Sequence, residues 1–341
     1  MKINEFDYYL PKELIAQHPS KVRSESRMMA INVKEQSVEH RMFSDIKDYL
    51  KKGDVLVLND TKVMPARLFG TKKETGAKIE ILILKIDGDS CECLVRNARA
   101  VKMDTVITFD DSLLTGRCIG IKKDGVRILK MESKLPLMDV LHQIGEIPLP
   151  PYIKEANQDT SRYQTVYAKN EGSSAAPTAG LHFTDTLLEE CKQKGVKLAF
   201  VTLHIGLATF KPVEVDNIED HKMHTEFYQI DEENATIITN AKNEGGRVIS
   251  VGTTSARVLE TVASKHGTII DTQGYSDIFI YPGYDFKIVE ALITNFHLPK
   301  STLLMMISAF AGTDFTKSFY QIAVEKNYRF FSFGDSMFLY R

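Results

Sequence analysis

The 341-residue chain has no tryptophan, four cysteines and no apolar run long enough to cross a bilayer. Its longest apolar run, residues 303–311, falls well short of the roughly 20 residues that a membrane-spanning helix needs, and residues 1–10 lack the apolar segment of a signal peptide. The cysteines, at positions 91, 93, 118 and 191, do not form the dense pattern of a disulfide framework. We therefore expect a folded cytoplasmic protein with no membrane partner.

Composition and charge are ordinary for a globular protein. Hydrophobic residues make up 43% and charged residues 26% of the chain, which excludes disordered and fibrous classes. The formal net charge is −2, so a nucleic-acid partner must be held by a local basic patch. Cys91 and Cys93 would share one face of a strand, which favours core positions over a metal or redox site.

The pattern of strands and helices predicts mixed α and β structure in two domains. Residues 67–152 contain short strands, two of them joined by an Asp124-Gly125 turn, which indicates an inserted small antiparallel β-barrel domain. Residues 153–341 alternate strands and helices, as in an α/β sheet with covering helices. Residues 1–66 hold too few strands for a domain, so we expect residues 1–66 plus 153–341 to form one discontinuous large α/β domain.

The expected elements follow from hydrophobic periodicity. In the barrel, the expected strands are residues 78–84, 91–96, 106–109, 117–121 and 126–130. In the large domain, the expected strands are residues 54–58, 197–204, 247–251, 277–281, 288–294 and 329–340, and the expected helices are one starting near Thr184 and residues 232–242, 255–265, 302–311 and 315–325.

Polar clusters follow four of the predicted strands. They are Asn59-Asp60-Thr61, residues 204–206, Gly252-Thr253-Thr254-Ser255 and residues 295–297. Open α/β sheets bind ligands at the carboxyl ends of their strands, so these clusters predict a site at one sheet edge if the sheet is largely parallel. The alternative is that they are ordinary polar turns.

Residues 252–255 are suited to an anion. Gly252 allows close approach to the backbone, and the following helix presents unpaired N–H groups and a positive dipole end to a carboxylate or phosphate. Arg257 could add a bidentate contact to a carboxylate. The alternative is that Thr254 or Ser255 simply caps the helix.

Residues 172–183 form a run of small residues before a predicted helix. A loop of this kind either closes over a ligand or is a flexible surface loop. No Walker lysine, dinucleotide-binding glycine pattern or nucleophile elbow occurs in the chain.

Residues 220–226 place His221 and His224 three positions apart between carboxylates. The two rings would be neighbours on a helix, where they could carry out acid–base chemistry or bind zinc with a further ligand such as His182 or His204. A salt-bridged structural cluster is the third interpretation.

Ten ordered motifs together resemble the S-adenosylmethionine:tRNA ribosyltransferase-isomerase family of queuosine biosynthesis. The motifs are residues 59–67 (NDTKVMPAR), 148–152 (PLPPY), 163–167 (YQTVY), 175–183 (AAPTAGLHF), 200–204 (FVTLH), 220–226 (DHKMHTE), 251–255 (VGTTS), 278–283 (IFIYPG), 294–299 (TNFHLP) and 328–332 (YRFFS). The resemblance spans essentially the whole chain and implies a large α/β catalytic domain that carries a small β-barrel.

The resemblance implies transfer and isomerisation of the ribosyl part of S-adenosylmethionine onto 7-aminomethyl-7-deazaguanine at the tRNA wobble position. The products are epoxyqueuosine, adenine and methionine. S-adenosylmethionine is then a co-substrate, and we expect no permanently bound cofactor, no metal and no obligatory protein partner, with a monomeric chain. The tRNA partner offers its anticodon loop, because unstacked loop bases are readable.

The reaction needs a base for a ribose C5′ proton, an acid for departing adenine and a neutral attacking amine. We expect proton transfer from His182, His204, His221, His224 or Glu226. Residues 252–255 with Arg257 would hold the methionine carboxylate. The remaining expected substrate contacts are Asn59, Asp60, Thr61, Arg67, Pro177, Thr178, Gly180, Tyr281, Asn295 and His297.

Basic residues of the barrel are the expected contacts to tRNA phosphates, namely Arg67, Lys72, Lys73, Lys78, Arg96, Arg99, Lys102, Lys122 and Lys123. Two other classes of function stay open. A metal-dependent hydrolase would use the His221 and His224 cluster, and a non-catalytic RNA-binding module would use the barrel alone.

Overall fold

The computed structural model describes residues 1–123, 125–153, 159–206 and 213–341. Two compact units are present. The larger consists of residues 1–62, 151–171 and 176–341, and the smaller of residues 63–150 and 172–175. Among the described residues, no helix is both long and apolar enough to span a membrane.

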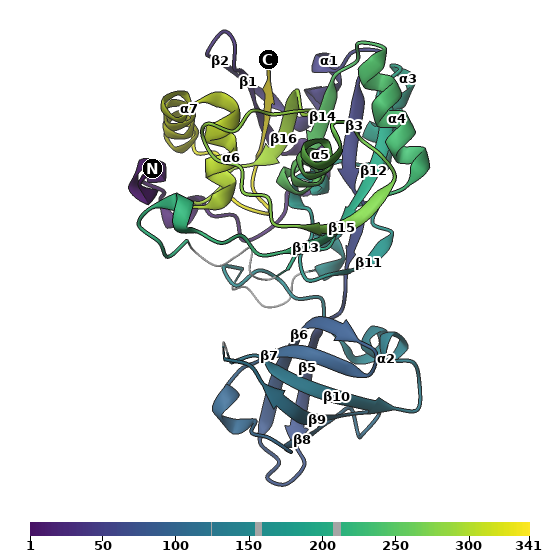
Figure 1. The fold of residues 1–341 in the computed structure, drawn as a ribbon. Helices are drawn as coiled ribbons and strands as arrows, with labels where there is room; N and C mark the ends of the chain where they lie inside the picture. The colour runs from purple at the N-terminus through teal and green to yellow at the C-terminus, as the bar shows by residue number, and fades with distance from the viewer. Residues whose placement is uncertain (124, 154–158, 207–212) are drawn as a thin grey trace. The chain divides into compact units, whose positions relative to one another are not determined.

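The larger unit is built on a nine-stranded mixed sheet with strand order β15-β13-β12-β3-β14-β16-β17-β1-β2 (Figure 1). The strands are β1 (Arg27–Asn32), β2 (Ser37–Met42), β3 (Val55–Asn59), β12 (Lys197–Leu203), β13 (Glu226–Ile230), β14 (Val248–Val251), β15 (Thr272–Ser276), β16 (Ala291–Asn295) and β17 (Ser336–Tyr340). Central strands β12, β3, β14 and β16 are mutually parallel. A short separate sheet pairs β4 (Thr61–Val63) with β11 (Asn170–Ser173).

Helices cover both faces of this sheet. They are α1 (Ile46–Tyr49), α3 (Asp185–Gln193), α4 (Glu232–Asn243), α5 (Thr253–His266), α6 (Thr302–Ala311) and α7 (Thr313–Glu325). The buried cluster that joins α3 to β3 and β14 contains no residue of α4 or α5, although both of these helices contact β3 and β14. Consequently α3 lies on one face, and α4 and α5 lie on the opposite face.

Local sequence explains where three of these helices begin. Thr184, Asp231 and Ser301 each accept a hydrogen bond from the backbone N–H three residues later, as N-cap side chains do. On the α3 face, Leu187 and Leu188 pack in one buried cluster with Leu56 and Leu58 of β3. These apolar contacts fix α3 against the sheet.

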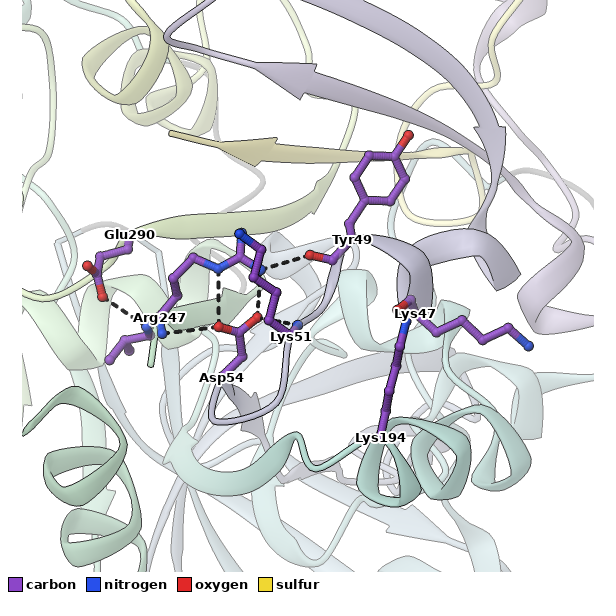
Figure 2. Close-up of polar contacts among 8 residues, drawn as sticks. Lys47, Tyr49, Lys51, Asp54, Lys194, Arg247 and Glu290 are labelled. Carbon is purple, nitrogen blue, oxygen red and sulfur yellow. Dashed lines mark hydrogen bonds and ion pairs between the residues drawn. The ribbon is translucent and has the colours of Figure 1, made fainter. Parts of the chain in front are cut away.

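Asp54 fastens the amino ends of the central strands, as Figure 2 shows. Its carboxylate accepts bonds from the Arg247 backbone N–H (3.1 Å), from the Arg247 guanidinium (2.6 and 3.1 Å) and from the Lys51 N–H (2.8 Å). Arg247 also donates to the Tyr49 carbonyl (2.8 Å). This edge of the sheet is therefore occupied by structural contacts.

The smaller unit is a closed antiparallel barrel with strand order β10-β7-β6-β5-β8-β9. The strands are β5 (Arg67–Lys72), β6 (Lys78–Asp87), β7 (Ser90–Val95), β8 (Val106–Phe109), β9 (Leu114–Ile121) and β10 (Arg127–Ser133), with helix α2 (Leu137–Ile144). Cys91, Cys93 and Cys118 lie in the barrel core, which confirms the core interpretation of the closely spaced pair. Asp124 of the predicted turn lies outside the described residues.

The predicted fold class is confirmed: mixed α and β structure with a large mixed sheet and a small antiparallel barrel. The expected strand at residues 277–281 is wrong. The strand nearest to this position is β15, which ends at Ser276 and, among the described residues, pairs with β13 alone at the edge of the sheet. Strands β1, β2, β5 and β13 were not expected from the sequence.

Candidate active site at the carboxyl ends of the parallel strands

The parallel register brings the four polar clusters to one edge of the sheet. Asn59 pairs with Val201, Leu58 pairs with Val251, and Val251 pairs with Ile293. The carboxyl ends of β3, β12, β14 and β16 therefore lie side by side, as the sequence predicted on the condition of a parallel sheet.

Asn59 holds two of these strand ends together. Its Nδ2 donates to the Leu203 carbonyl (3.1 Å), and its Oδ1 accepts from the N–H groups of Leu203 (3.0 Å) and Thr61 (3.1 Å). The side chain is completely buried. Asn59 therefore stabilises the pairing of the ends of β3 and β12.

Asp60 is a nearly buried carboxyl at the end of β3. It accepts hydrogen bonds from Thr202 Oγ1 (2.7 Å) and Asn170 Nδ2 (3.0 Å). Burial raises its pKa, although these two hydrogen bonds and Lys169 oppose the shift. Asp60 also lines a cavity of about 210 Å³.

His204 is fixed by Thr61. The Thr61 hydroxyl donates to the Asn170 carbonyl (3.4 Å), so its oxygen accepts the Nδ1–H of His204 (2.8 Å). The His204 ring stacks on Phe227, with centroids 5.6 Å apart. Burial lowers the pKa of His204, and its Nε2 is left as the lone-pair nitrogen.

His182 is buried with both ring nitrogens engaged. Asn295 Nδ2 donates to its Nε2 (3.0 Å), and its Nδ1–H donates to Ser26 Oγ (2.7 Å). Burial, assisted by two nearby arginines, lowers its pKa to about 3. The expectation that His182 exchanges protons near neutral pH is therefore not supported by its surroundings.

The small-residue loop packs against the same sheet edge. Its short 3-10 helix, Thr178–His182, is almost wholly buried, and Thr178 Oγ1 donates to Asn295 Oδ1 (3.0 Å). A Cβ on Gly180 would lie 2.0 Å from the Tyr167 hydroxyl, so only glycine fits there. The flexible-surface interpretation of this loop is wrong, because its residues from Ala175 to His182 are mostly buried.

Helix α5 begins without a side-chain cap. Its N-cap is Gly252, with φ of 90°, and Ser255 Oγ donates to the Val251 carbonyl (2.9 Å). Capping by Thr254 or Ser255 is therefore wrong. No side chain of the described residues caps the first N–H groups of α5, and free N–H groups are what an anion site requires.

Arg257 pairs with Glu226. Its guanidinium forms a buried ion pair with that carboxylate, whose other oxygen accepts the Gly206 N–H (3.0 Å). Arg257 also points toward the carbonyls of His224 (3.5 Å) and Ser276 (3.4 Å). The side chain that we expected to bind a carboxylate of the substrate already binds one of the protein.

The His221 and His224 pair is not helical. Asp220 ends a short 3-10 helix, Ile218–Asp220, and His221 is extended, with φ of −74° and ψ of 128°. The helical-neighbour premise is therefore wrong. Burial and His224 lower the pKa of His221, and the described residues contain no cluster of three or more His, Cys, Asp or Glu side chains that could hold a metal.

The remaining predicted residues are spread over both units. His297 is buried against Thr294 Oγ1 (2.9 Å), and burial lowers its pKa to about 3. Tyr281 is partly exposed and packs on Phe279, and Pro177 precedes the 3-10 helix of the small-residue loop. Arg67 lies in the barrel, where it pairs with Glu80 at 2.8 Å.

Several of the barrel cations are already paired. Arg96 shares Glu80 with Arg67, Lys72 pairs with Glu74, and Lys122 pairs with Glu92. Within the described part of the chain, five of the nine predicted phosphate contacts form no ion pair, namely Lys73, Lys78, Arg99, Lys102 and Lys123.

Three residues of the site were missed in the sequence. Ser26 orients His182, while Thr202 and Asn170 bind Asp60. Thr202 lies inside a predicted strand two residues before His204, so its place near the carboxyl end was a usable signal. Ser26 and Asn170 carry no local signal, because they reach the site from distant parts of the chain.

Buried polar side chains gathered at the carboxyl edge of a parallel sheet are the arrangement of an α/β enzyme. The chain belongs to the queuosine biosynthesis protein family, whose family model matches residues 3–339. It is also similar to the crystal structure of an S-adenosylmethionine tRNA ribosyltransferase from Thermotoga maritima. The sequence identity is 40%, the TM-score is 0.58, and the match covers 98% of this chain and 99% of that one.

Proposed function

We propose that this enzyme transfers and isomerises the ribosyl moiety of S-adenosylmethionine onto 7-aminomethyl-7-deazaguanine at the wobble position of tRNA. The products are epoxyqueuosine in the tRNA, free adenine and free methionine. Membership of the queuosine biosynthesis family supports this reaction, as does the similarity to the Thermotoga enzyme. The observation that carries it is the strand-end site, where a neutral histidine, a buried carboxyl and an uncapped helix N-terminus share one sheet edge.

His204 is the proposed base for the ribose C5′ proton. Thr61 fixes its tautomer, and its lowered pKa keeps Nε2 unprotonated at neutral pH. His182 is a positioning residue for Asn295 in this proposal, and Glu226 is one for Arg257. His221 and His224 are the alternative proton-transfer residues.

The N-terminus of α5 is the proposed site for the methionine carboxylate. Its first N–H groups carry the positive end of the dipole of a 14-residue helix. Arg257 makes no direct contact with the carboxylate in this proposal, because its charge is already matched by Glu226. Gly252 leaves the backbone open to close approach.

The proposed macromolecular partner is the tRNA anticodon loop in the cytoplasm. Lys73, Lys78, Arg99, Lys102 and Lys123 of the barrel are its proposed phosphate contacts. Binding should weaken steeply with salt, because each neutralised phosphate releases counterions. S-adenosylmethionine is the co-substrate, and the proposal includes no permanent cofactor and a monomeric chain.

Adenine release tests the reaction. Purified protein is incubated with S-adenosylmethionine and tRNA that carries the 7-aminomethyl-7-deazaguanine base, with a chelator present, and products are separated by chromatography. Adenine and methionine should appear only with this tRNA and not with tRNA lacking the modified base. Absence of adenine while the tRNA binds would favour an RNA-binding module, and activity abolished by the chelator would favour a metal-dependent enzyme.

A further inference from the structure

A cavity of about 210 Å³ lies within the larger unit beside the end of β3. Asp60 and Thr202 form its buried floor, with exposed fractions of 7% and 5%. Tyr167 and Phe200 contribute aromatic walls, with ring centroids 5.9 Å apart and planes inclined by 56°. Asn170 and Asp231 lie nearer the solvent.

The cavity exists because two strands separate. Strands β12 and β13 pair only at Thr202 with Gln229 and at Leu203 with Tyr228. Two residues earlier along β12, the Phe200 N–H donates to Asn234 Oδ1 (2.6 Å) of α4 instead of to a strand. The gap between the strands is therefore held open by the first turn of α4.

The polar lining combines the carboxylates of Asp60 and Asp231 with the Lys169 ammonium and the side-chain amides of Asn170, Gln229 and Asn234. A carboxylate offers about four lone-pair sites, and Asp60 uses only two of them, for Thr202 and Asn170. Asp231 uses Oδ1 to cap α4, and its Oδ2 accepts no hydrogen bond from any described residue. A flat ring with N–H donors would match the free lone pairs of these two carboxylates, and ring nitrogens or oxygens that accept would match Lys169 and the amides.

The volume limits the size of that ligand. Pockets for drug-sized molecules measure roughly 300–1,000 Å³, so this cavity suits one ring system and excludes a whole nucleoside with its amino-acid tail. Aromatic walls favour a planar heterocycle, because rings stack on or against them.

We propose that this cavity binds a purine-type base that carries amino groups, with Asp60 accepting from its N–H edge. The inference rests on the proposed function, which supplies two such bases. One is the adenine that leaves S-adenosylmethionine, and the other is the 7-aminomethyl-7-deazaguanine that accepts the ribosyl group. Their shared chemistry is a flat bicyclic ring with N–H donors.

Calorimetric titration of the full chain with each free base tests this proposal without any turnover. The probes are free adenine and free 7-aminomethyl-7-deazaguanine, with uracil as a smaller ring for comparison. The Asp60→Asn variant keeps the size of the side chain and replaces one acceptor with a donor. The Gln229→Trp variant fills the cavity from an exposed position, so it does not depend on the stability of the buried floor.

The matched control is Gln193→Trp, which places the same bulky ring on an exposed glutamine at the end of α3, outside the cavity. One of the two purine-type bases should bind the unaltered chain. Both cavity variants should weaken that binding at least tenfold, while Gln193→Trp should not change it. The base that binds identifies the occupant as the leaving or the accepting ring.

Binding of neither base, or unchanged binding in both cavity variants, would overturn the proposal. These outcomes are separate from failure of the proposed function, which is decided by adenine release from S-adenosylmethionine. A chain that releases adenine normally but fails the titration would keep its function and lose this site assignment.

Discussion

Glu226 at the start of β13 and Arg257 of α5 form an ion pair whose side chains are only 4% and 6% exposed. Removing one member of a buried pair leaves an uncompensated charge, which typically costs about 3–5 kcal/mol. We expect Arg257→Gln and Glu226→Gln each to lower the free energy of unfolding by about that amount. Urea denaturation followed by circular dichroism measures the change.

The exposed pair Lys287 and Asp285 supplies the control, with side chains 48% and 89% exposed. Replacement of Lys287 by glutamine should change the free energy of unfolding by less than about 1 kcal/mol. Equal effects at the buried and the exposed pair would contradict the role assigned to Arg257 and Glu226.

Acid should destabilise the fold through His182 and His297. Burial lowers the folded-state pKa of each to about 3, whereas an unfolded histidine has a pKa near 6.5. Below about pH 6.5 the unfolded chain binds a proton that the folded chain cannot bind. The contribution of each histidine to the free energy of unfolding is therefore fully present above pH 6.5 and decreases as pH falls toward 3. The loss is roughly 2 kcal/mol per histidine at pH 5.

Urea unfolding at pH 7 and pH 5 measures this loss. The His297→Gln variant should show a smaller difference between the two pH values than the unaltered chain. His266 is exposed at the end of α5, so His266→Gln should keep the full difference. An unaltered difference in His297→Gln would disprove the assignment.

Replacement of His204 by glutamine should remove the proposed base. General-base catalysis contributes roughly 10²–10⁴-fold, so we expect kcat for adenine release to fall within that range while the KM for S-adenosylmethionine changes little. Because the pKa of His204 is lowered, the active unprotonated form persists below pH 6.5, and the acid limb of kcat/KM should lie there. Near-normal kcat in His204→Gln would shift the role to His221 or His224, and His266→Gln serves as the active control.

The four thiols should be unreactive in the folded protein. All four cysteines are buried, and burial raises the pKa of Cys91 to about 12 and that of Cys191 to about 11. The thiolate is the reactive form, so a maleimide should label none of them under native conditions at pH 7. All four should react in guanidinium chloride, and rapid native labelling of any one would contradict its core position.

Parts of the site were predictable because local sequence controls them. Polar residues directly after an apolar strand, such as Asn59 and Asp60 after β3, are recognisable from periodicity alone. The uses of those residues were not predictable. Asn59 ties two strands and Arg257 meets Glu226 through contacts between segments that are far apart along the chain.

Sequence by itself determined the mixed α and β class, the order of the polar clusters and the family, because periodicity and motifs are local properties of the chain. Only the tertiary structure decided the protonation and pairing of the site. His182 and His204 each follow a leucine in the sequence, yet both ring nitrogens of His182 are hydrogen-bonded, whereas Nε2 of His204 has no hydrogen-bond partner among the described residues. Burial and partners from distant segments set that difference, and neither is written in the local sequence.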